Sequence, residues 1–332
     1  MKSVAAADLE EAARALLPPE VFDYFAGGSD DEGTLAANVD GWTHMRLRPR
    51  VLRDVTVVDT RTTLLGHAVP SPIVVAPTAF HRMAHPDGEL ASARGAAAAG
   101  AHFILSTRST TPVEEVAAAL DGTPFWYQVY VVRDRELTVE LTRRAVAAGA
   151  TAVVLTADVP RLGHRLRDVR NRFGLPGNLA DQDASLTFDD IKWLAELAGV
   201  PVVVKGVLRG DDAAACVDAG AAGIVVSNHG GRQLDGAITG TEALPDVVAA
   251  VGDRVEIYVD GGIRRGTDVV KALALGARAV LVGRPVLWGL AVNGADGVRD
   301  VMRDLATELD LAMALCGCPS LADVTNDLLA GV

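Results

Sequence analysis

The stretch VVSNHGGRQ, residues 225–233, places a hydroxyl, an amide, an imidazole and a guanidinium directly after two apolar β-branched residues. Branched apolar residues are typical of a strand, and the two glycines permit backbone conformations that other residues resist. His229 and Arg232 lie three positions apart, so one could transfer a proton while the other holds a carboxylate. The alternative is a polar loop with a solvated histidine, and the rest of the chain decides between the two.

The same arrangement, a short apolar run followed by polar residues, recurs along the chain. Each run is rich in Val and Ile, as expected of strands that are buried on both faces. Alanine-rich amphipathic segments separate the runs, and glycines typical of helix exits precede five of them, at Gly100, Gly149, Gly199, Gly220 and Gly276. The predicted strands span residues 73–76, 103–105, 125–129, 152–155, 202–204, 223–226, 255–259 and 279–282.

Strands and helices that alternate in one unbroken series predict a closed parallel (β/α)8 barrel, the TIM barrel, within the α/β class. An open doubly wound sheet is the alternative. We expect a single domain over residues 1–332, with an N-terminal helical extension at 1–70, the barrel at 71–316 and a C-terminal tail at 317–332.

Local signals place several helix ends. Residues 5–16 are an alanine-rich helical pattern that Pro18-Pro19 ends, and residues 21–26 are a short helix stopped by Gly27-Gly28. Residues 111–114 combine a threonine, a proline and a glutamate in the order expected of an N-cap, a first helical position and a capping box.

Composition excludes several classes of protein. Hydrophobic residues make up 49% of the chain and charged residues 22%, which indicates a packed core rather than disorder. The net charge of -12 argues against a nucleic-acid or anionic-membrane partner. The N-terminus lacks the features of a signal peptide, and no uncharged apolar run is long enough to span a bilayer. The three cysteines form no metal-site spacing, which predicts a reduced, cytoplasmic protein without a bound metal.

A TIM barrel requires its ligand-binding residues to follow the C-terminal ends of the strands. Polar or charged residues follow at least seven of the predicted strands in register, which favours a ligand site over a set of solvated loops. These positions are Pro77-Thr78-Ala79, Ser106, Gln128 and Tyr130, Thr156 and Asp158, Arg165, Lys205, Ser227 to Arg232, Asp260 to Arg264, and Gly283-Arg284.

The last two strands carry a pattern typical of phosphate binding. Gly261-Gly262 and Gly283-Arg284 allow close backbone approach, and Arg264 and Arg284 supply positive charge. Tight turns without a ligand are the alternative. No Gly-x-Gly-x-x-Gly follows a strand, so a Rossmann nucleotide site is unsupported. A phosphorylated cofactor with a polar ring fits the neutral donors and acceptors on the earlier strands.

Three further positions suggest chemistry and leave alternatives open. Lys205 ends a buried strand and could be a Schiff-base lysine or a fixed cation beside a cofactor. Asp158 could orient His229, or could only pair with an arginine. Arg165 and Arg232 come from different loops and suggest a clamp on a substrate carboxylate.

These residues resemble a known family, the FMN-dependent 2-hydroxy acid oxidases and dehydrogenases, which includes glycolate oxidase, lactate oxidase and mandelate dehydrogenase. The resemblance covers nearly the whole chain, and its independent matches occur in the family's order. They lie at residues 22–28, 76–79, 84–89, 128–130, 156–163, 204–206, 227–233, 260–266 and 282–285.

The resemblance implies a role for each position. His229 would be the catalytic base paired with Asp158, Lys205 would stabilise negative charge on the reduced flavin, and Tyr130 would face the substrate hydroxyl. The substrate-binding residues would be Tyr24, Tyr130, Arg165, Arg232 and, at the distal end of the substrate, Arg108. The FMN-binding residues would be Pro77, Thr78, Ala79, Ser106, Gln128, Thr156, Lys205, Ser227, Asp260, Gly261, Gly262, Arg264, Gly283 and Arg284.

The implied reaction is oxidation of an L-2-hydroxy acid to the 2-oxo acid, with oxygen reoxidising FMN and forming hydrogen peroxide. Whether His229 takes the α-carbon proton or the hydroxyl proton is left open. A dehydrogenase with a quinone or carrier acceptor is the main alternative, although Ala79, where some dehydrogenases have glycine, favours an oxidase. An FMN-dependent isomerase and a Schiff-base aldolase are alternatives of other classes. The resemblance also implies a homotetramer or octamer.

Arg108 departs from the family pattern, because glycolate oxidase-like members have an aromatic residue there. We expect this position to change substrate choice. Arg108 either admits a polar or second acidic group of the substrate or points to solvent with an open pocket behind it. Residues 171–187 are short for the family and lack the apolar, basic insertion of membrane-bound mandelate dehydrogenases, which supports the absence of a membrane partner.

Overall fold

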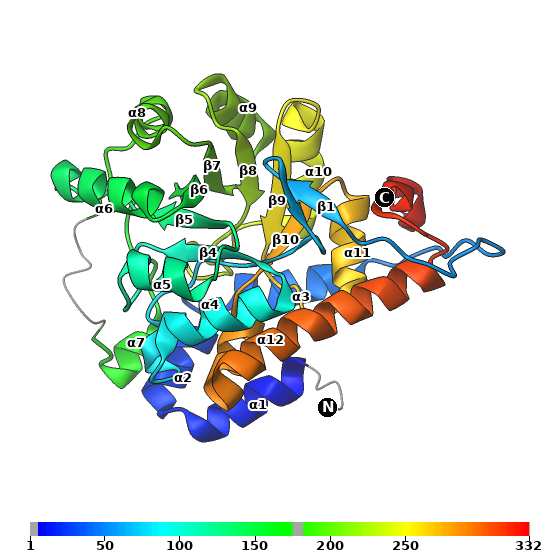
Figure 1. Cartoon of the computed structure of the whole chain (residues 1–332), viewed down its shortest axis with the longest axis horizontal. Helices are drawn as coiled ribbons and strands as arrows, with labels where there is room; N and C mark the ends of the chain where they lie inside the picture. Colours follow the sequence, from blue (N-terminus) through cyan, green and yellow to red (C-terminus); the bar gives the residue numbers. More distant parts are fainter. Residues whose placement is uncertain (1–5, 175–181, 332) are drawn as a thin grey trace.

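The computed structural model describes residues 6–174 and 182–331, and its centre is a closed barrel of eight parallel strands (Figure 1). Each strand pairs with its neighbour in sequence, and the last pairs with the first, which confirms the predicted TIM barrel. Part of the short segment at 171–187 lies outside the described residues. The strands are β3 (Ile73–Val75), β4 (His102–Ser106), β5 (Phe125–Val129), β6 (Ala150–Thr156), β7 (Val202–Val207), β8 (Gly223–Val226), β9 (Glu256–Asp260) and β10 (Ala279–Val282).

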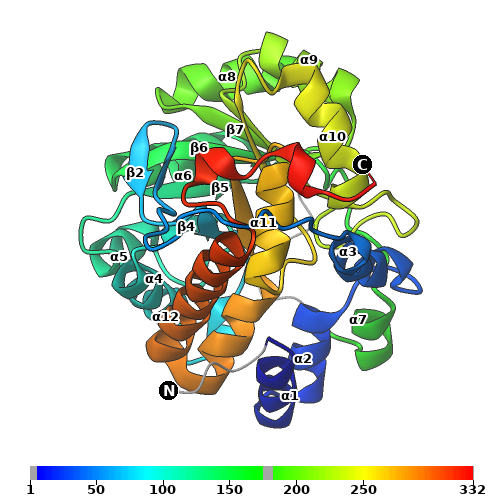
Figure 2. The same ribbon diagram turned by 90° about the vertical axis from the view of Figure 1, so that its right-hand side faces the viewer.

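Helices surround the barrel, so both faces of most strands are buried (Figures 1 and 2). Every residue of β3, β4, β5, β8 and β10 is buried, which explains why these runs lack an alternating polar face. All five predicted exit glycines have positive φ, between 65° and 104°, where glycine is favoured. The helices are α4 (Gly88–Ala99), α5 (Val113–Ala119), α6 (Arg135–Ala147), α7 (Leu166–Asn171), α8 (Asp189–Ala198), α9 (Gly210–Asp218), α10 (Gly240–Val251), α11 (Gly266–Ala274) and α12 (Arg284–Leu315), with 3-10 turns at His81–Met83, Leu321–Asp323 and Asn326–Leu328.

The start of α5 differs from the sequence prediction. Thr111 does not cap the helix, because its hydroxyl donates to the buried carboxylate of Glu89 at 3.0 Å. Pro112 precedes the first helical residue, and Glu114 pairs with Arg144 instead of closing a capping box. A tertiary hydrogen bond has therefore replaced a local one.

The N-terminal extension contains the two predicted helices, α1 (Ala6–Leu16) and α2 (Pro19–Ala26), and a third, α3 (Gly33–His44), that the sequence did not reveal. Gly33 at the start of α3 and Gly41 inside it weaken the helical pattern, and the residue before the helix, Glu32, has a left-handed φ of 64°. α3 docks on the barrel because Trp42 Nε1 donates to the carbonyl of Gly261 at 2.7 Å.

A short hairpin covers the opposite end of the barrel. β1 (Thr62–Leu64) and β2 (His67–Val69) pair antiparallel, and the chain turns at Leu65 and Gly66. Leu64 is fully buried against side chains from inside the barrel, and the Leu65 N–H donates to Glu256 at the start of β9. The hairpin therefore seals the N-terminal ends of the strands and leaves the C-terminal ends for a ligand.

No helix within the described ranges is both long and apolar enough to cross a membrane.

Replacing Leu64 with alanine should test the sealing role of the hairpin. The change leaves a cavity under the barrel, so we expect the free energy of unfolding to fall by about 2–5 kcal/mol. Denaturant titration with a far-ultraviolet circular dichroism signal measures the loss. Leu234→Ala is the control, because Leu234 is 71% exposed, and its effect should stay within about 0.5 kcal/mol. Equal effects of the two changes would contradict the assignment.

Candidate active site

Predicted site residues from the loops after all eight barrel strands, and from α2, line one cavity of about 1080 Å³ including its open mouth. Tyr24, Pro77, Thr78, Ala79, Ser106, Arg108, Tyr130, Arg165, Lys205, His229, Arg232, Asp260, Gly261, Gly262, Arg264, Gly283 and Arg284 all line it. Gln128, Thr156, Asp158 and Ser227 are not in its lining and contact lining residues or one another instead. The structure therefore brings the predicted residues together, in two layers.

The second layer is a row of hydrogen bonds across neighbouring strands. Ser106 Oγ donates to Gln128 Oε1 at 3.0 Å, and Gln128 Nε2 donates to Thr156 Oγ1 at 2.9 Å. Thr156 lies opposite Lys205 in the parallel register, and Lys205 Nζ donates to Ser227 Oγ at 2.9 Å. Each side chain thus has a fixed orientation, which gives the floor of the cavity a defined pattern of donors and acceptors.

His229 lies in a strained turn directly after β8. Its φ is 60°, an uncommon value for a residue with a side chain, and the next two glycines also have positive φ. Its own N–H donates to Ser227 Oγ at 3.0 Å, and the Gly231 N–H donates to Asn228 Oδ1 at 3.0 Å. These bonds hold the strained backbone and aim the imidazole into the cavity.

Asp158 orients the His229 ring. His229 Nδ1 lies 2.9 Å from Asp158 Oδ1, which leaves Nε2 as the ring nitrogen available to the cavity. Burial lowers the pKa of His229 below its ordinary value, and the Asp158 carboxylate opposes only part of that shift. Burial raises the pKa of Asp158, but the charges of His229 and Lys205 outweigh burial and hold it below its usual range. The pair is therefore a neutral base beside an ionised carboxylate at neutral pH.

Lys205 is a fixed cation on the floor of the cavity. Its Nζ lies 3.1 Å from Asp260 Oδ2, and the side chain is almost fully buried. Burial lowers the pKa of Lys205, but the carboxylates of Asp260 and Asp158 outweigh it and raise the pKa above its ordinary value. A Schiff-base lysine needs a neutral amine, so this geometry favours the fixed cation of the two alternatives.

Three arginines gather positive charge at one end of the cavity, namely Arg232, Arg264 and Arg284. Within residues 6–174 and 182–331 none of them pairs with a carboxylate, and each donates to main-chain carbonyls. Burial and the charge of Arg165 lower the pKa of Arg232 to about 10. Burial and the other two guanidiniums lower the pKa of Arg284 well below its ordinary value. Because arginine stays charged in proteins, this end of the cavity carries an excess of positive charge and suits an anionic ligand.

The backbone beside these arginines comes unusually close to the extension. A Cβ on Gly262 would lie 1.9 Å from the Asn38 carbonyl oxygen, so only glycine fits there. Gly283 precedes the first turn of α12, and the positive end of the helix dipole there favours an anion. Two carboxylate oxygens, Asp260 Oδ1 and Asp158 Oδ2, are buried without a hydrogen-bond partner among the described residues. The cavity therefore has an end that suits a phosphate, and unmet polar groups lie in and beside its lining.

The cavity continues past Arg232 to a region that carries aromatic and further cationic groups. The guanidinium carbon of Arg232 lies 5.0 Å from the Tyr24 ring centroid, and that of Arg108 lies 4.8 Å from the Tyr130 ring centroid. Arg165 Nε is buried and has no hydrogen-bond partner among the described residues. Arg108 lines the cavity and stacks on Tyr130, so it does not simply point to solvent, which was one of its two predicted placements.

Two residues that hold the site, Asn38 and Gln182, were not predicted. Asn38 in α3 and Asn228 beside His229 each donate a side-chain N–H to the side-chain amide oxygen of the other, at 2.9 and 2.8 Å. This pair ties the extension to the loop that carries His229. Gln182 lines the cavity beside Arg108. When its side-chain amide is oriented so that the nitrogen donates to the Val159 carbonyl, the amide oxygen accepts from Arg108 at 3.3 Å. Asn38 and Asn228 are 190 residues apart, and no pattern in the sequence connects them.

Comparison with known proteins agrees with this geometry. The family described as FMN-dependent dehydrogenase matches residues 13–183 and 179–331. The chain belongs to this family. The chain is 48% identical to an L-lactate oxidase of Nostoc sp., with 97% of this chain and 96% of that protein covered. It is 45% identical to 2-hydroxyacid oxidase 1 of Homo sapiens, with 97% and 95% covered.

A solved structure of a mandelate oxidase with benzoyl-formic acid is 48% identical, has a TM-score of 0.93 and covers 98% of each chain. The protein is thus an FMN-dependent oxidoreductase. The cavity fits FMN, because the arginine cluster and the glycines suit its phosphate, and the hydrogen-bonded floor suits a polar ring. In this fit, Arg264, Arg284, Gly262 and Gly283 would hold the phosphate, and Lys205 would lie at the ring.

Replacing Arg264 with methionine should weaken FMN binding. Among the described residues the Arg264 side chain donates one hydrogen bond, to the carbonyl of its neighbour Ile263, so the change removes charge with little structural loss. We expect the FMN dissociation constant to rise by about 10–100-fold, as for a lost charged hydrogen bond of roughly 1.5–3 kcal/mol. Quenching of flavin fluorescence on binding measures it. Arg143→Met on the exposed face of α6 is the control, and an unchanged constant for the Arg264 variant would contradict the phosphate role.

Proposed function

We propose that the protein oxidises an L-2-hydroxy acid to the 2-oxo acid and that oxygen is the final electron acceptor, giving hydrogen peroxide. One observation carries the proposal: a histidine–aspartate pair, His229 and Asp158, shares its cavity with an arginine pair and a tyrosine suited to a carboxylate. The names of the relatives, lactate, hydroxyacid and mandelate oxidase, support both the substrate class and oxygen. When bound, FMN would supply the two-electron acceptor for this oxidation.

The substrate carboxylate binds to Arg165, Arg232 and Tyr24. Arg232 gives one nitrogen to the carbonyls of Tyr24 and Gly27, at 2.7 and 2.8 Å, so its remaining donors face the cavity in a fixed orientation. Arg165 contributes its Nε, which has no partner among the described residues. Two guanidiniums from different loops recognise the planar carboxylate and fix the α-carbon.

The proton that leaves the substrate passes to Nε2 of His229. The lowered pKa of His229 keeps the ring neutral and ready to accept a proton at neutral pH. Asp158 then stabilises the imidazolium through the 2.9 Å contact at Nδ1. Tyr130 lies at the substrate hydroxyl, and the Lys205 cation stabilises negative charge that develops on the floor of the cavity.

We also propose a cytoplasmic location and assembly into homotetramers or octamers. All three cysteines are free and buried, as in a reducing compartment. Apolar side chains are exposed on the loop before β1 and at the end of α12, where a second copy would bury them. These residues are Val51, Leu52, Val57, Leu311 and Leu315.

A quinone or protein carrier remains the alternative acceptor for the same half-reaction. Ala79 lines the cavity in this chain, where some dehydrogenase members have glycine, and this favours the oxidase. Oxygen consumption with stoichiometric peroxide distinguishes the two acceptors.

Replacing His229 with glutamine should abolish reduction while FMN stays bound. Glutamine retains polarity and volume but cannot accept the proton, so the rate should fall beyond the ~10²–10⁴-fold typical of general acid–base groups. The measurement is anaerobic bleaching of the flavin absorbance in a stopped-flow instrument, across a panel of 2-hydroxy acids. A near-normal rate would exclude His229 as the base. A colourless wild-type protein that borohydride traps with substrate would indicate an aldolase instead.

Replacing Arg108 with tryptophan should change substrate preference. Arg108 lines the substrate end of the cavity beside Tyr130, so its charge favours a hydroxy acid with a distal polar or acidic group. We expect kcat/KM for a hydroxy diacid to fall about tenfold or more relative to glycolate and mandelate, as for a lost charged contact. Arg108→Lys, which retains the charge, is the control. An unchanged order of preference would exclude Arg108 from specificity.

A further inference from the structure

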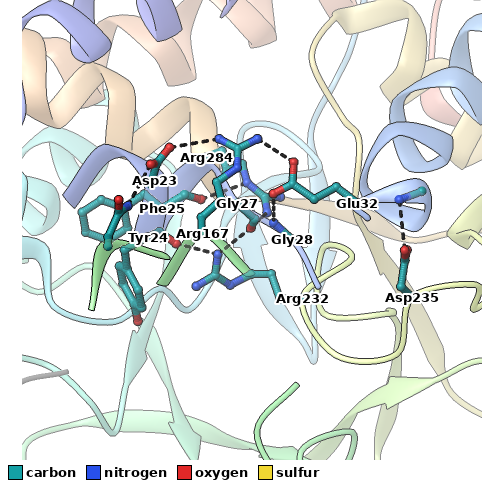
Figure 3. Close-up of polar contacts among 12 residues, drawn as sticks. Asp23, Tyr24, Phe25, Gly27, Gly28, Glu32, Arg167, Arg232, Asp235 and Arg284 are labelled. Carbon is teal, nitrogen blue, oxygen red and sulfur yellow. Dashed lines mark hydrogen bonds and ion pairs between the residues drawn. The ribbon is translucent and has the colours of Figure 1, made fainter. Parts of the chain in front are cut away.

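Arg167 bridges two elements that carry the carboxylate-binding residues. It lies on α7, two positions after Arg165, and its guanidinium pairs with Asp23 at 3.2 Å and with Glu32 at 2.5 Å (Figure 3). Asp23 immediately precedes Tyr24 in α2. α2 and α7 lie side by side in both views of the molecule (Figures 1 and 2). Arg167 therefore connects the segment of Tyr24 with the loop of Arg165.

The Tyr24 segment, residues 23–28, is held on its other side by arginines of the barrel. Arg232 donates to the carbonyls of Tyr24 and Gly27, and Arg284 donates to those of Phe25 and Gly27 at 3.0 and 2.9 Å (Figure 3). These bonds fix the backbone against the barrel. They do not connect the segment with α7, and Arg167 supplies that contact together with Asn171.

The contact is close-packed as well as charged. A Cβ on Gly27 would lie 2.7 Å from the Asp23 carbonyl oxygen, 3.3 Å from Arg167 Cδ and 3.4 Å from Glu32 Oε1, so the arginine stem packs closely on a position that has no room for a side chain. Glu32 Oε1 also accepts the Gly28 N–H at 3.0 Å. The side chains of all three ion-pair partners are only 22–30% exposed, which distinguishes this network from a solvated surface pair.

Arg167 also balances charge near the anion sites. Asp23 lies in the Tyr24 segment and Glu32 lies four residues beyond it, and the charge of Glu32 reaches Arg284. Without Arg167, both carboxylates would compete with the anionic ligands of the cavity for its guanidiniums. The substitution of Arg167 therefore removes a positional restraint and a neutralising charge together.

We propose that Arg167 is a positioning residue for substrate binding: through Asp23 and Glu32 it fixes Tyr24 relative to Arg165 and preorganises the carboxylate site. The proposal rests on the proposed 2-hydroxy acid oxidation. A carboxylate that does not change during the reaction is bound equally in ground and transition states, so a looser site raises KM more than it lowers kcat.

Other contacts keep the segment attached when Arg167 is replaced. Asn171 Nδ2 donates to Asp23 Oδ2 at 2.9 Å, and His164 Nδ1 lies 2.8 Å from Asp30 Oδ1. The Asp30 N–H donates to the His164 carbonyl at 2.8 Å. We therefore expect an Arg167 variant to fold and to retain FMN.

The test compares Arg167→Ala, Arg167→Lys and the control Arg170→Ala in the FMN-loaded enzyme. Arg170 is exposed on the same helix α7. For Arg167→Ala we expect KM for the 2-hydroxy acid to rise about tenfold, equivalent to roughly 1.4 kcal/mol, with kcat within about twofold of wild type. Arg167→Lys should recover part of the loss, because it restores charge but not the two-pronged contact. Arg170→Ala should leave KM and kcat unchanged, and the FMN dissociation constant should be the same as in the wild type.

A double-mutant cycle with Tyr24→Phe separates positioning from general destabilisation. If Arg167 acts through the substrate contact of Tyr24, its replacement should raise KM clearly less in the Tyr24→Phe background than in the wild type. Additive effects, or an unchanged KM for Arg167→Ala, would overturn the proposal. Should Arg167→Ala not fold, Glu32→Gln and Arg167→Lys each take its place in the cycle with Tyr24→Phe, and the same outcomes support or overturn the proposal. Failure of the wild-type enzyme to be bleached by any 2-hydroxy acid would instead refute the proposed function.

Discussion

Closure of the parallel sheet is the constraint on which the rest of the molecule depends. Because every strand runs in the same direction and the last pairs with the first, all eight C-terminal ends meet at one rim. Residues far apart in sequence, such as Ser106, Lys205 and Asp260, therefore line a single cavity. The hairpin at the other end seals the barrel, so polar groups at the rim face a ligand while the strands beneath them remain apolar.

The rim could be predicted because its signals are local. Buried parallel strands read as short Val- and Ile-rich runs, and a residue such as His229 or Lys205 has a known place once its strand is known. α3 was not predicted, since its glycines and the left-handed Glu32 hide the helical pattern. The Asn38–Asn228 pair and the Arg167 contacts were not predicted either, because they join segments whose proximity only the folded chain creates. The cap predicted at Thr111 was wrong for the same reason, because its hydroxyl donates to the carboxylate of Glu89 and does not cap α5.

Electrostatics divides the cavity into regions with different tasks. Lys205 has counter-ions, Asp260 and Asp158, and its charge is stable on the floor. The cluster of Arg232, Arg264 and Arg284 lacks carboxylate partners within the described ranges, and burial makes its charge costly until an anion binds. His229 is close enough to Lys205 and Arg165 for their charges to act on it, and burial keeps it neutral. The same barrel thus keeps a base uncharged a short distance from several permanent cations.

The N-terminal extension belongs to the site for the same electrostatic reason. Arg232 and Arg284 have few acceptors in the barrel, and the carbonyls of Tyr24, Phe25 and Gly27 satisfy part of their hydrogen-bonding capacity. The donors that remain face the cavity and define where anions bind. The extension and the anionic ligands therefore bind to the same guanidiniums. Because the extension orients these groups, its ordering and the binding of the anions are thermodynamically coupled. In the proposed function, a segment outside the barrel thereby becomes part of the machinery that recognises the substrate.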